Sequence, residues 1–131
     1  MSIPLADRTT VEAAEAIERA SLAILPLGAI EQHGPHLALR TDISIATALA
    51  GRVADALGDT ALLLPPMPYG LSEHHTAFAG TVTLRPDTLI RLILDIVESM
   101  AAQGIDRVII VNGHGGNMDA IRLAARQSRR D

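Results

Sequence analysis

Apolar residues in this chain gather in short unbroken runs, and between the runs apolar and polar residues recur at helical spacing. The runs are LAILPLG at 22–28, ALLLPP at 61–66 and RVIIVN at 107–112. None of them shows the period of two that is typical of a half-exposed strand. They therefore predict strands that are buried on both faces of a parallel sheet.

Helical patterns flank the first of these runs. Thr9 followed by Glu12 is a capping-box pattern, which predicts a helix that extends to about residue 20. Asp42 opens a second helix, predicted over 42–58, in which apolar residues recur at every fourth position. This stripe is expected to face the core and consists of Ile45, Leu49, Val53 and Leu57.

Two more helices are predicted after the second and third runs. Pro86 suits the first turn of a helix and Gly104 suits a left-handed C-terminal cap, so a helix is expected over 86–103. Asn117 is expected to cap the last helix, which continues into the basic tail RQSRRD. Strands that alternate with helices of this length predict an α/β fold, a three-layer αβα arrangement with a mostly parallel central sheet.

Composition and charge narrow the class of protein. With 131 residues, of which 48% are apolar and 20% charged, the chain suits one packed domain and not a disordered segment. Tyr69 and Phe78 are its only aromatic residues and its formal charge is -4, which argues against a nucleic-acid partner.

Location and metal chemistry are also constrained. The N-terminus has no basic stretch followed by an apolar run, and no uncharged segment approaches the roughly 20 residues of a membrane span. We therefore expect a cytoplasmic protein that does not contact membranes. Because the chain has no cysteine, any metal ion must be held by histidine and carboxylate side chains.

Histidines follow each predicted strand. The first run leads into EQHGPH, the second into EHH and the third into NGHGG. In open α/β sheets, sites lie beyond the carboxyl ends of the strands, so these histidines are expected at one end of the sheet. Packing alone does not readily explain such a set, which comprises His33, His36, His74, His75 and His114.

Each polar element taken alone has an ordinary explanation. Glu31 and His33 point the same way on an extended segment, but an isolated pair of this kind is more often a solvated loop. Asp42 could simply cap its helix, and the glycines around His114 could form a phosphate-binding turn. Taken together, two carboxylates and two imidazoles suit Zn, Mn or Fe(II) better than Ca or Mg, and a bridging carboxylate would allow two ions.

Three segments carry a family resemblance. LPLGAIEQHGPHLALRTD resembles the signature of the creatininase family of amidohydrolases, EHHTAFAGTVTL resembles its EH-containing FPGT segment, and VNGHGGN resembles its NGHGGN turn. The resemblance covers 21–117, with the motifs in the family's order. It implies a creatininase-like fold and a single truncated domain over 1–131 that corresponds to the N-terminal half of such a protein.

The same resemblance implies a metal-dependent amidohydrolase with two divalent ions, Zn first and Mn or Fe as alternatives. Glu31 and His114 would bind one ion, His33 the other, and Asp42 both. A water between two such ions can have a pKa of about 7, which would supply hydroxide for attack on a small or cyclic amide. The expected proton donors are His75 and Glu73, or else a group in the other half. Residues expected beside the ligands or the substrate are His36, Gly115 and Gly116.

Two departures from the family pattern leave alternatives open. Creatininase has a ligating glutamate where this chain has Gly116, and the family usually has proline where this chain has Ala79. Because the motifs do not distinguish the family's activities and the chain has about half the family's usual length, a mycofactocin-type peptidase, a formamide deformylase or an incomplete fragment that only folds and oligomerises are alternatives to a creatinine-like amidohydrolase. The family resemblance also implies a homo-oligomer, most often a hexamer.

Overall fold

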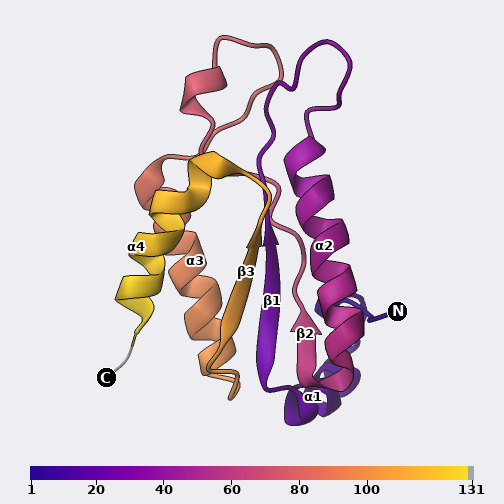
Figure 1. The fold of residues 1–131 in the computed structure, drawn as a ribbon. Helices are drawn as coiled ribbons and strands as arrows, with labels where there is room; N and C mark the ends of the chain where they lie inside the picture. The colour runs from indigo at the N-terminus through magenta and orange to yellow at the C-terminus, as the bar shows by residue number, and fades with distance from the viewer. Residues whose placement is uncertain (130–131) are drawn as a thin grey trace.

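A parallel sheet runs through the middle of the computed structural model, which describes residues 1–129 (Figure 1). Its strands are β1 (Leu22–Leu27), β2 (Ala61–Leu63) and β3 (Val108–Asn112), in the order β2-β1-β3, and both pairings are parallel. The predicted α/β class is confirmed. β2 is shorter than the predicted run because the prolines that follow it, at 65 and 66, have no N–H group to donate to a neighbouring strand.

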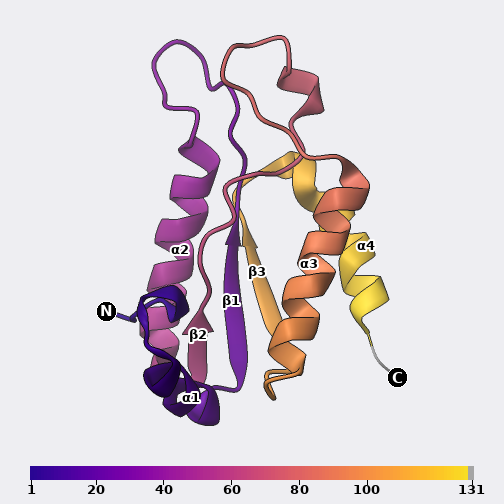
Figure 2. The ribbon, with the colours of Figure 1, turned by 180° about the vertical axis from the view of Figure 1, so that it is seen from behind.

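Helices cover both faces of the sheet (Figures 1 and 2). Ala50 and Ala54 of α2 pack with Ile24 on one face, whereas residues of α1, α3 and α4 pack with Leu25 and Leu27 on the other. The predicted three layers are therefore present. The helices are α1 (Thr10–Arg19), α2 (Thr41–Leu57), α3 (Pro86–Ala101) and α4 (Met118–Ser128), with 3-10 turns η1 (Leu5–Asp7), η2 (Gly58–Thr60), η3 (Glu73–His75) and η4 (Gly115–Asn117).

Most helix ends lie where their capping residues predict them. The Thr9 side chain accepts from the Glu12 N–H and the Glu12 carboxylate accepts from the Thr9 N–H, which is the predicted capping box. Pro86 begins α3, and Gly104, just beyond its end, has a φ of 92°, a left-handed conformation that favours glycine. Of the predicted basic tail, Arg130 and Asp131 lie outside the described residues.

The predicted apolar stripe of α2 is wrong at Ile45, Leu49 and Leu57. Ile45 is 57% exposed and Leu49 is 51% exposed, and the helix instead buries Ala46, Ala50 and Ala54. These alanines recur at the same four-residue spacing, and their small side chains let the helix axis lie close to the sheet. Of the bulkier stripe, Ile45, Leu49 and Leu57 are exposed, whereas Val53 is half-buried and packs beside Ala50 and Ala54.

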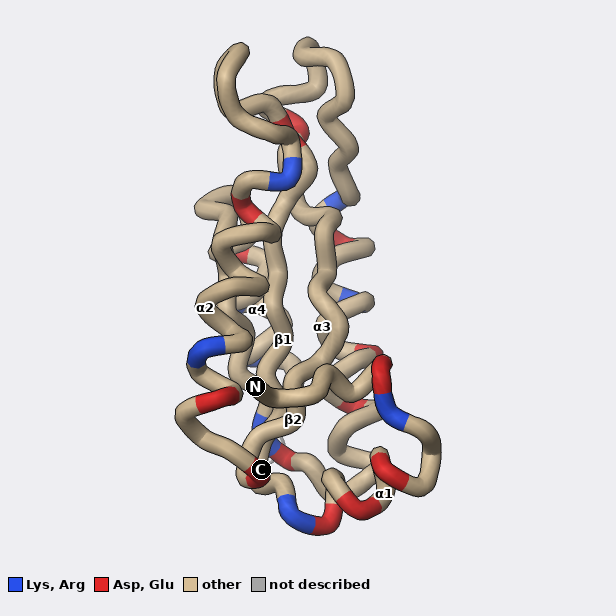
Figure 3. Tube along the Cα trace, turned by 90° about the vertical axis from the view of Figure 1, so that its right-hand side faces the viewer, with Lys and Arg blue, Asp and Glu red and all other residues tan. Residues whose placement is uncertain are grey.

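The prediction that β3 is buried on both faces is also wrong. β3 is an edge strand of the described sheet, and its Ile109 is 43% exposed. Ile109 lies on the face that α2 covers, but this face of β3 packs into the core only at Val111, two residues further along. Acidic and basic residues lie interspersed around α1 and the lower ends of the helices (Figure 3). Within residues 1–129, every helix is too short or too polar to cross a membrane.

Candidate metal centre

The loops that follow the strands meet above the carboxyl end of the sheet, as the histidine positions predict. Figures 1 and 2 show the loop between β1 and α2 rising beside the loop that carries η3. The Gly113 N–H donates to the Leu27 carbonyl at 2.8 Å, which brings the turn after β3 to the same place. A bridge between Ile30 and Val82 joins the two longer loops, and a bridge between Gly70 and Thr83 closes the loop between β2 and α3 on itself.

Four predicted ligands lie in contact at this end of the sheet. His114 Nδ1 lies 3.0 Å from Asp42 Oδ2 and 3.3 Å from Glu31 Oε1, and His33 Nε2 lies 2.9 Å from Asp42 Oδ1. Glu31, Asp42 and His114 are only 5–6% exposed, and His33 is half-buried. The structure thus brings together residues more than eighty positions apart. Asp42 lies inside the first turn of α2, where Arg40 occupies the cap position, so the helix-cap explanation of Asp42 does not hold.

Carbonyl groups fix the tautomers of both histidines. His33 Nδ1 lies 3.2 Å from the carbonyl oxygen of Glu31, and His114 Nε2 lies 2.7 Å from that of Leu71. A carbonyl oxygen can only accept, so these two nitrogens carry protons. In the neutral rings, His33 Nε2 and His114 Nδ1 then direct lone pairs at opposite oxygens of Asp42.

Lone pairs directed at carboxylate oxygens repel them unless a cation lies between. Glu31 Oε2 and Asp42 Oδ2 are buried without a hydrogen-bond donor, and neither carboxylate pairs with an arginine among the described residues. Metal–ligand distances of about 2.0–2.2 Å place neighbouring ligand atoms roughly 3 Å apart, as observed. The donor set therefore fits divalent ions of the zinc type.

The environment of His33 favours a positive charge at this position. Burial by itself lowers the pKa of His33, but the hydrogen bond to the Glu31 carbonyl and the negative charge of Asp42 together outweigh burial. The pKa of His33 is therefore raised above its usual value. A proton and a metal ion therefore compete for His33 Nε2, the nitrogen that faces Asp42.

Two glycines of the turn permit the close contacts of the centre. A Cβ at Gly113 would lie 2.2 Å from the Asp42 carbonyl oxygen, and a Cβ at Gly116 would lie 2.5 Å from His114 Nε2 and 2.6 Å from the Leu71 oxygen. A side chain at position 116 would therefore force His114 or the Leu71 carbonyl to shift, which would disturb the bond that fixes the His114 tautomer. At Gly115 a Cβ would meet nothing within 4 Å, so the close contacts of this turn lie at the other two glycines.

A buried amide network that sequence reasoning missed supports His114. Asn117 occupies the predicted N-cap position of α4, but its side chain makes no capping hydrogen bond. Its Oδ1 instead accepts from the Leu71 N–H at 2.9 Å, and its Nδ2 donates to the Gly28 carbonyl at 3.0 Å. Asn112 in turn binds the His114 backbone through its Nδ2 and Oδ1. The sequence indicates this network through Asn112 and Asn117, the two asparagines that flank the glycines and the histidine of the turn.

The remaining predicted residues divide into two groups. His74 and His75 reach the centre: each offers a ring nitrogen that lies within 4.8 Å of the other's and of a Glu31 carboxylate oxygen, and the ring of His74 stacks on His114. Glu73 and His36 are exposed. His74 and His75 therefore lie beside the four ligands, and Glu73 belongs to the same 3-10 turn η3.

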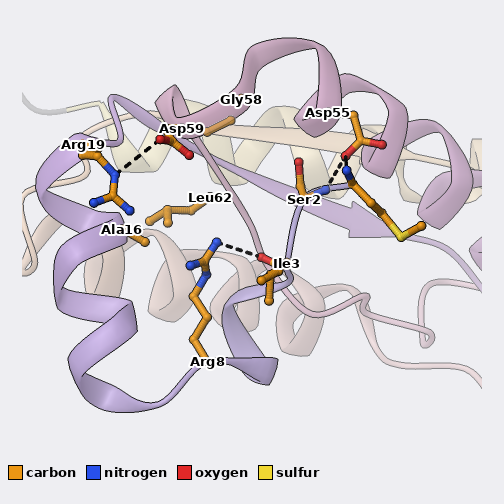
Figure 4. Close-up of a pocket in the computed structure, with 11 residues that line it drawn as sticks. Ser2, Ile3, Arg8, Ala16, Arg19, Asp55, Gly58, Asp59 and Leu62 are labelled. Atoms are coloured by element: carbon orange, nitrogen blue, oxygen red, sulfur yellow. Dashed lines mark hydrogen bonds and ion pairs between the residues drawn. The ribbon is translucent and has the colours of Figure 1, made fainter.

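A pocket near the N-terminus lies at the opposite end of the sheet and is separate from this centre (Figure 4). Its charged groups already have partners. Arg19 lies 3.6 Å from Asp59, Arg8 donates to the Ile3 carbonyl, and Asp55 accepts from the Ser2 N–H.

Comparison with known proteins adds independent information. A family model described as "Creatininase: Creatinine amidohydrolase" matches residues 6–131. The mycofactocin precursor peptide peptidase of Mycobacterium ulcerans (strain Agy99) is 46% identical over 113 residues, with 81% of this chain and 45% of that protein covered. The creatinine amidohydrolase of Pseudomonas putida is 36% identical over 115 residues, with 81% and 44% covered.

Solved structures agree with this similarity. One described as "Creatininase Mn" superposes with a TM-score of 0.84 at 32% identity and covers 97% of this chain and 52% of its own. The chain spans about half the length of the curated relatives that it matches.

Proposed function

Because this chain belongs to the creatininase family, we propose that its four buried ligands hold two divalent ions of an amidohydrolase that cleaves a C–N amide bond. The observation that supports this most is the placement of Asp42. Each of its oxygens faces the unprotonated nitrogen of a different histidine, at 2.9 Å for His33 and 3.0 Å for His114. Asp42 would therefore bridge the ions, and Glu31 would complete the side occupied by His114.

Zinc or manganese ions at such a centre would lower the pKa of water to about 7 and polarise a substrate carbonyl. The chain's own residues would set up this chemistry. The Leu71 and Glu31 carbonyls hold the proton of each neutral ring on the nitrogen that faces away from the centre, and burial of the two carboxylates strengthens their attraction for cations. His75 and Glu73 of η3 are the chain's candidates for acting on the amide itself, which we expect to be small or cyclic.

A peptidase is the second candidate function. The relative that is 46% identical is named a peptide peptidase, whereas the creatinine amidohydrolase is 36% identical. Gly116 also stands where creatininase has a glutamate ligand, so the surroundings of the ions differ from those expected for creatinine hydrolysis. A formamide deformylase of the same family is a further alternative.

Metal analysis tests the proposal directly. After dialysis against zinc and then against buffer, mass spectrometry should find close to two ions per chain, and Asp42→Asn should bind far fewer. Asp106→Asn, an exposed aspartate before β3, is the matched control and should bind as the unmodified chain does. One ion per chain would contradict the bridging role of Asp42, and a value near zero would refute the metal centre.

Activity assays distinguish the substrate classes. The metal-loaded protein should be offered creatinine, a formamide and a dipeptide amide. Hydrolysis should be followed by formation of the ring-opened product creatine for creatinine, and by release of the amine or ammonia for the other two. Cleavage of the dipeptide amide alone would favour the peptidase alternative. Failure to cleave any of the three by a protein that holds both ions would count against the amidohydrolase proposal.

A further inference from the structure

Gln32 joins the loop after β1 to the ring of His75. Its Oε1 accepts from the Gly34 N–H at 2.9 Å, and its Nε2 lies 3.1 Å from His75 Nδ1. The Gly34 contact fixes which end of the amide is which, because a backbone N–H needs an acceptor. The group that faces His75 is therefore the NH2 group, which can only donate.

This contact determines the proton position on His75. Since Nδ1 accepts from Gln32, the neutral ring carries its proton on Nε2. An imidazolium would set an Nδ1–H against the Gln32 NH2 group, and a metal ion on Nε2 would have to displace the only ring proton. The arrangement at His33 and His114 is the reverse. Their ring nitrogens that face away from the centre donate to carbonyls, and their other nitrogens direct lone pairs at the centre.

The ring of His75 is held beside the centre. Its centroid lies 4.2 Å from that of His74 and 6.0 Å from that of Phe78, which meets it edge-on. The His75 N–H donates to the Ser72 carbonyl at 2.9 Å, which anchors the turn. Glu31, His74 and His75 could be taken for another cation site, but the bond from Gln32 opposes this.

We propose that Gln32 is a positioning residue that holds His75 as a neutral Nε2–H donor, and that this N–H stabilises the negative charge that develops on the carbonyl oxygen of the amide. This inference rests on the proposed amidohydrolase function. His75 keeps its proton throughout, which differs from the proton donation expected from the sequence. The attacking water supplies both the hydroxyl group that adds to the carbonyl carbon and the proton that the leaving nitrogen gains.

Nitrogen-15 NMR tests the assignment without any activity. Long-range proton–nitrogen spectra at about pH 8.5, where imidazoles are neutral, should show His75 as the Nε2–H tautomer. Gln32→Glu keeps an acceptor for the Gly34 N–H but also offers one to His75, so the ring should switch to the Nδ1–H tautomer. Gln103→Glu, an exposed change beyond α3, is the control and should leave the spectrum of His75 unchanged.

The unmodified chain alone can overturn the assignment, since an Nδ1–H tautomer of His75 would contradict it even if the variant failed to fold. With a substrate in hand, Gln32→Glu should lower kcat by about 10²-fold to 10³-fold, as expected for loss of a hydrogen bond to a developing oxyanion, with little change in KM. Zinc content should stay the same, because His75 is not a ligand. Loss of zinc with unchanged kcat per bound ion would refute the positioning role, whereas the expected tautomer with no amide cleaved would refute the proposed function.

Discussion

Replacing Asn117 with alanine should damage both the fold and the metal centre. The Asn117 side chain is fully buried and makes hydrogen bonds at 2.9, 3.0 and 3.1 Å with the Leu71 N–H, the Gly28 carbonyl and Asn112 Oδ1. Alanine removes all of these bonds at once. It also releases Leu71, whose carbonyl oxygen fixes the tautomer of His114.

The size of the effect follows from the groups left without partners. Each buried polar group that loses its only hydrogen bond costs about 1–3 kcal/mol, so the loss at the Leu71 N–H and the Gly28 carbonyl should total roughly 2–6 kcal/mol, whereas Asn112 Oδ1 keeps the bond from the His114 N–H. Domains of this kind are stable by only about 5–15 kcal/mol, so the variant should be marginally folded. Misorientation of the ligand should weaken zinc binding by about 10-fold to 100-fold.

Urea unfolding in EDTA measures the first effect, and competition with a zinc indicator measures the second. Gln127→Ala is the control, because Gln127 is exposed on α4, the helix that follows Asn117, and its loss should change stability by less than about 0.5 kcal/mol. If Asn117→Ala cost less than about 1 kcal/mol and kept the zinc affinity of the unmodified chain, the network would not support the centre as argued.

Three further predictions test other features of the structure. A group with a raised pKa stabilises the folded state only while it is protonated. In EDTA, the Tm advantage of the unmodified chain over His33→Gln should therefore be full below about pH 6.5 and should fall as pH rises through the raised pKa of His33. A Tm advantage that grows with pH would contradict the raised pKa. Gly116→Ala should lose about 1–3 kcal/mol of stability and much of its zinc affinity, whereas Gly115→Ala, where there is open space, should keep both; equal effects would refute the close approach. Ile45→Ala should cost less than about 1 kcal/mol in urea unfolding, against about 2–5 kcal/mol for Ile93→Ala in the core, and the reverse order would restore the predicted stripe.

The parts of the fold that depend on local chemistry could be predicted from the sequence. The unbroken apolar runs marked the strands, and Thr9, Pro86 and Gly104 marked helix ends through hydrogen bonds or dihedral preferences within a few residues. The orientation of α2 could not be predicted in this way. Its leucines and its alanines recur at the same spacing, and only the distance between helix and sheet decides which set is buried.

The candidate site shows the same division. The convergence of Glu31, His33, Asp42 and His114 was predictable because loops that follow parallel strands meet at one edge. The proton positions on the rings were not. They depend on partners that lie far away in the chain, such as the Leu71 carbonyl, which is 43 positions from His114.

The charges at this centre explain why it needs a cation. A buried carboxylate costs several kcal/mol in solvation, and the N-terminus of α2 offsets only about 0.3–1 kcal/mol of this for Asp42, which lies in its first turn. Glu31 belongs to no helix and also lies buried against His114. Apolar residues in these places would pack without that cost, so the fold gains nothing from the carboxylates themselves. Burial of these carboxylates beside unprotonated imidazole nitrogens is favourable only when a positive charge lies between them. Divalent ions supply two positive charges each, more than a proton does.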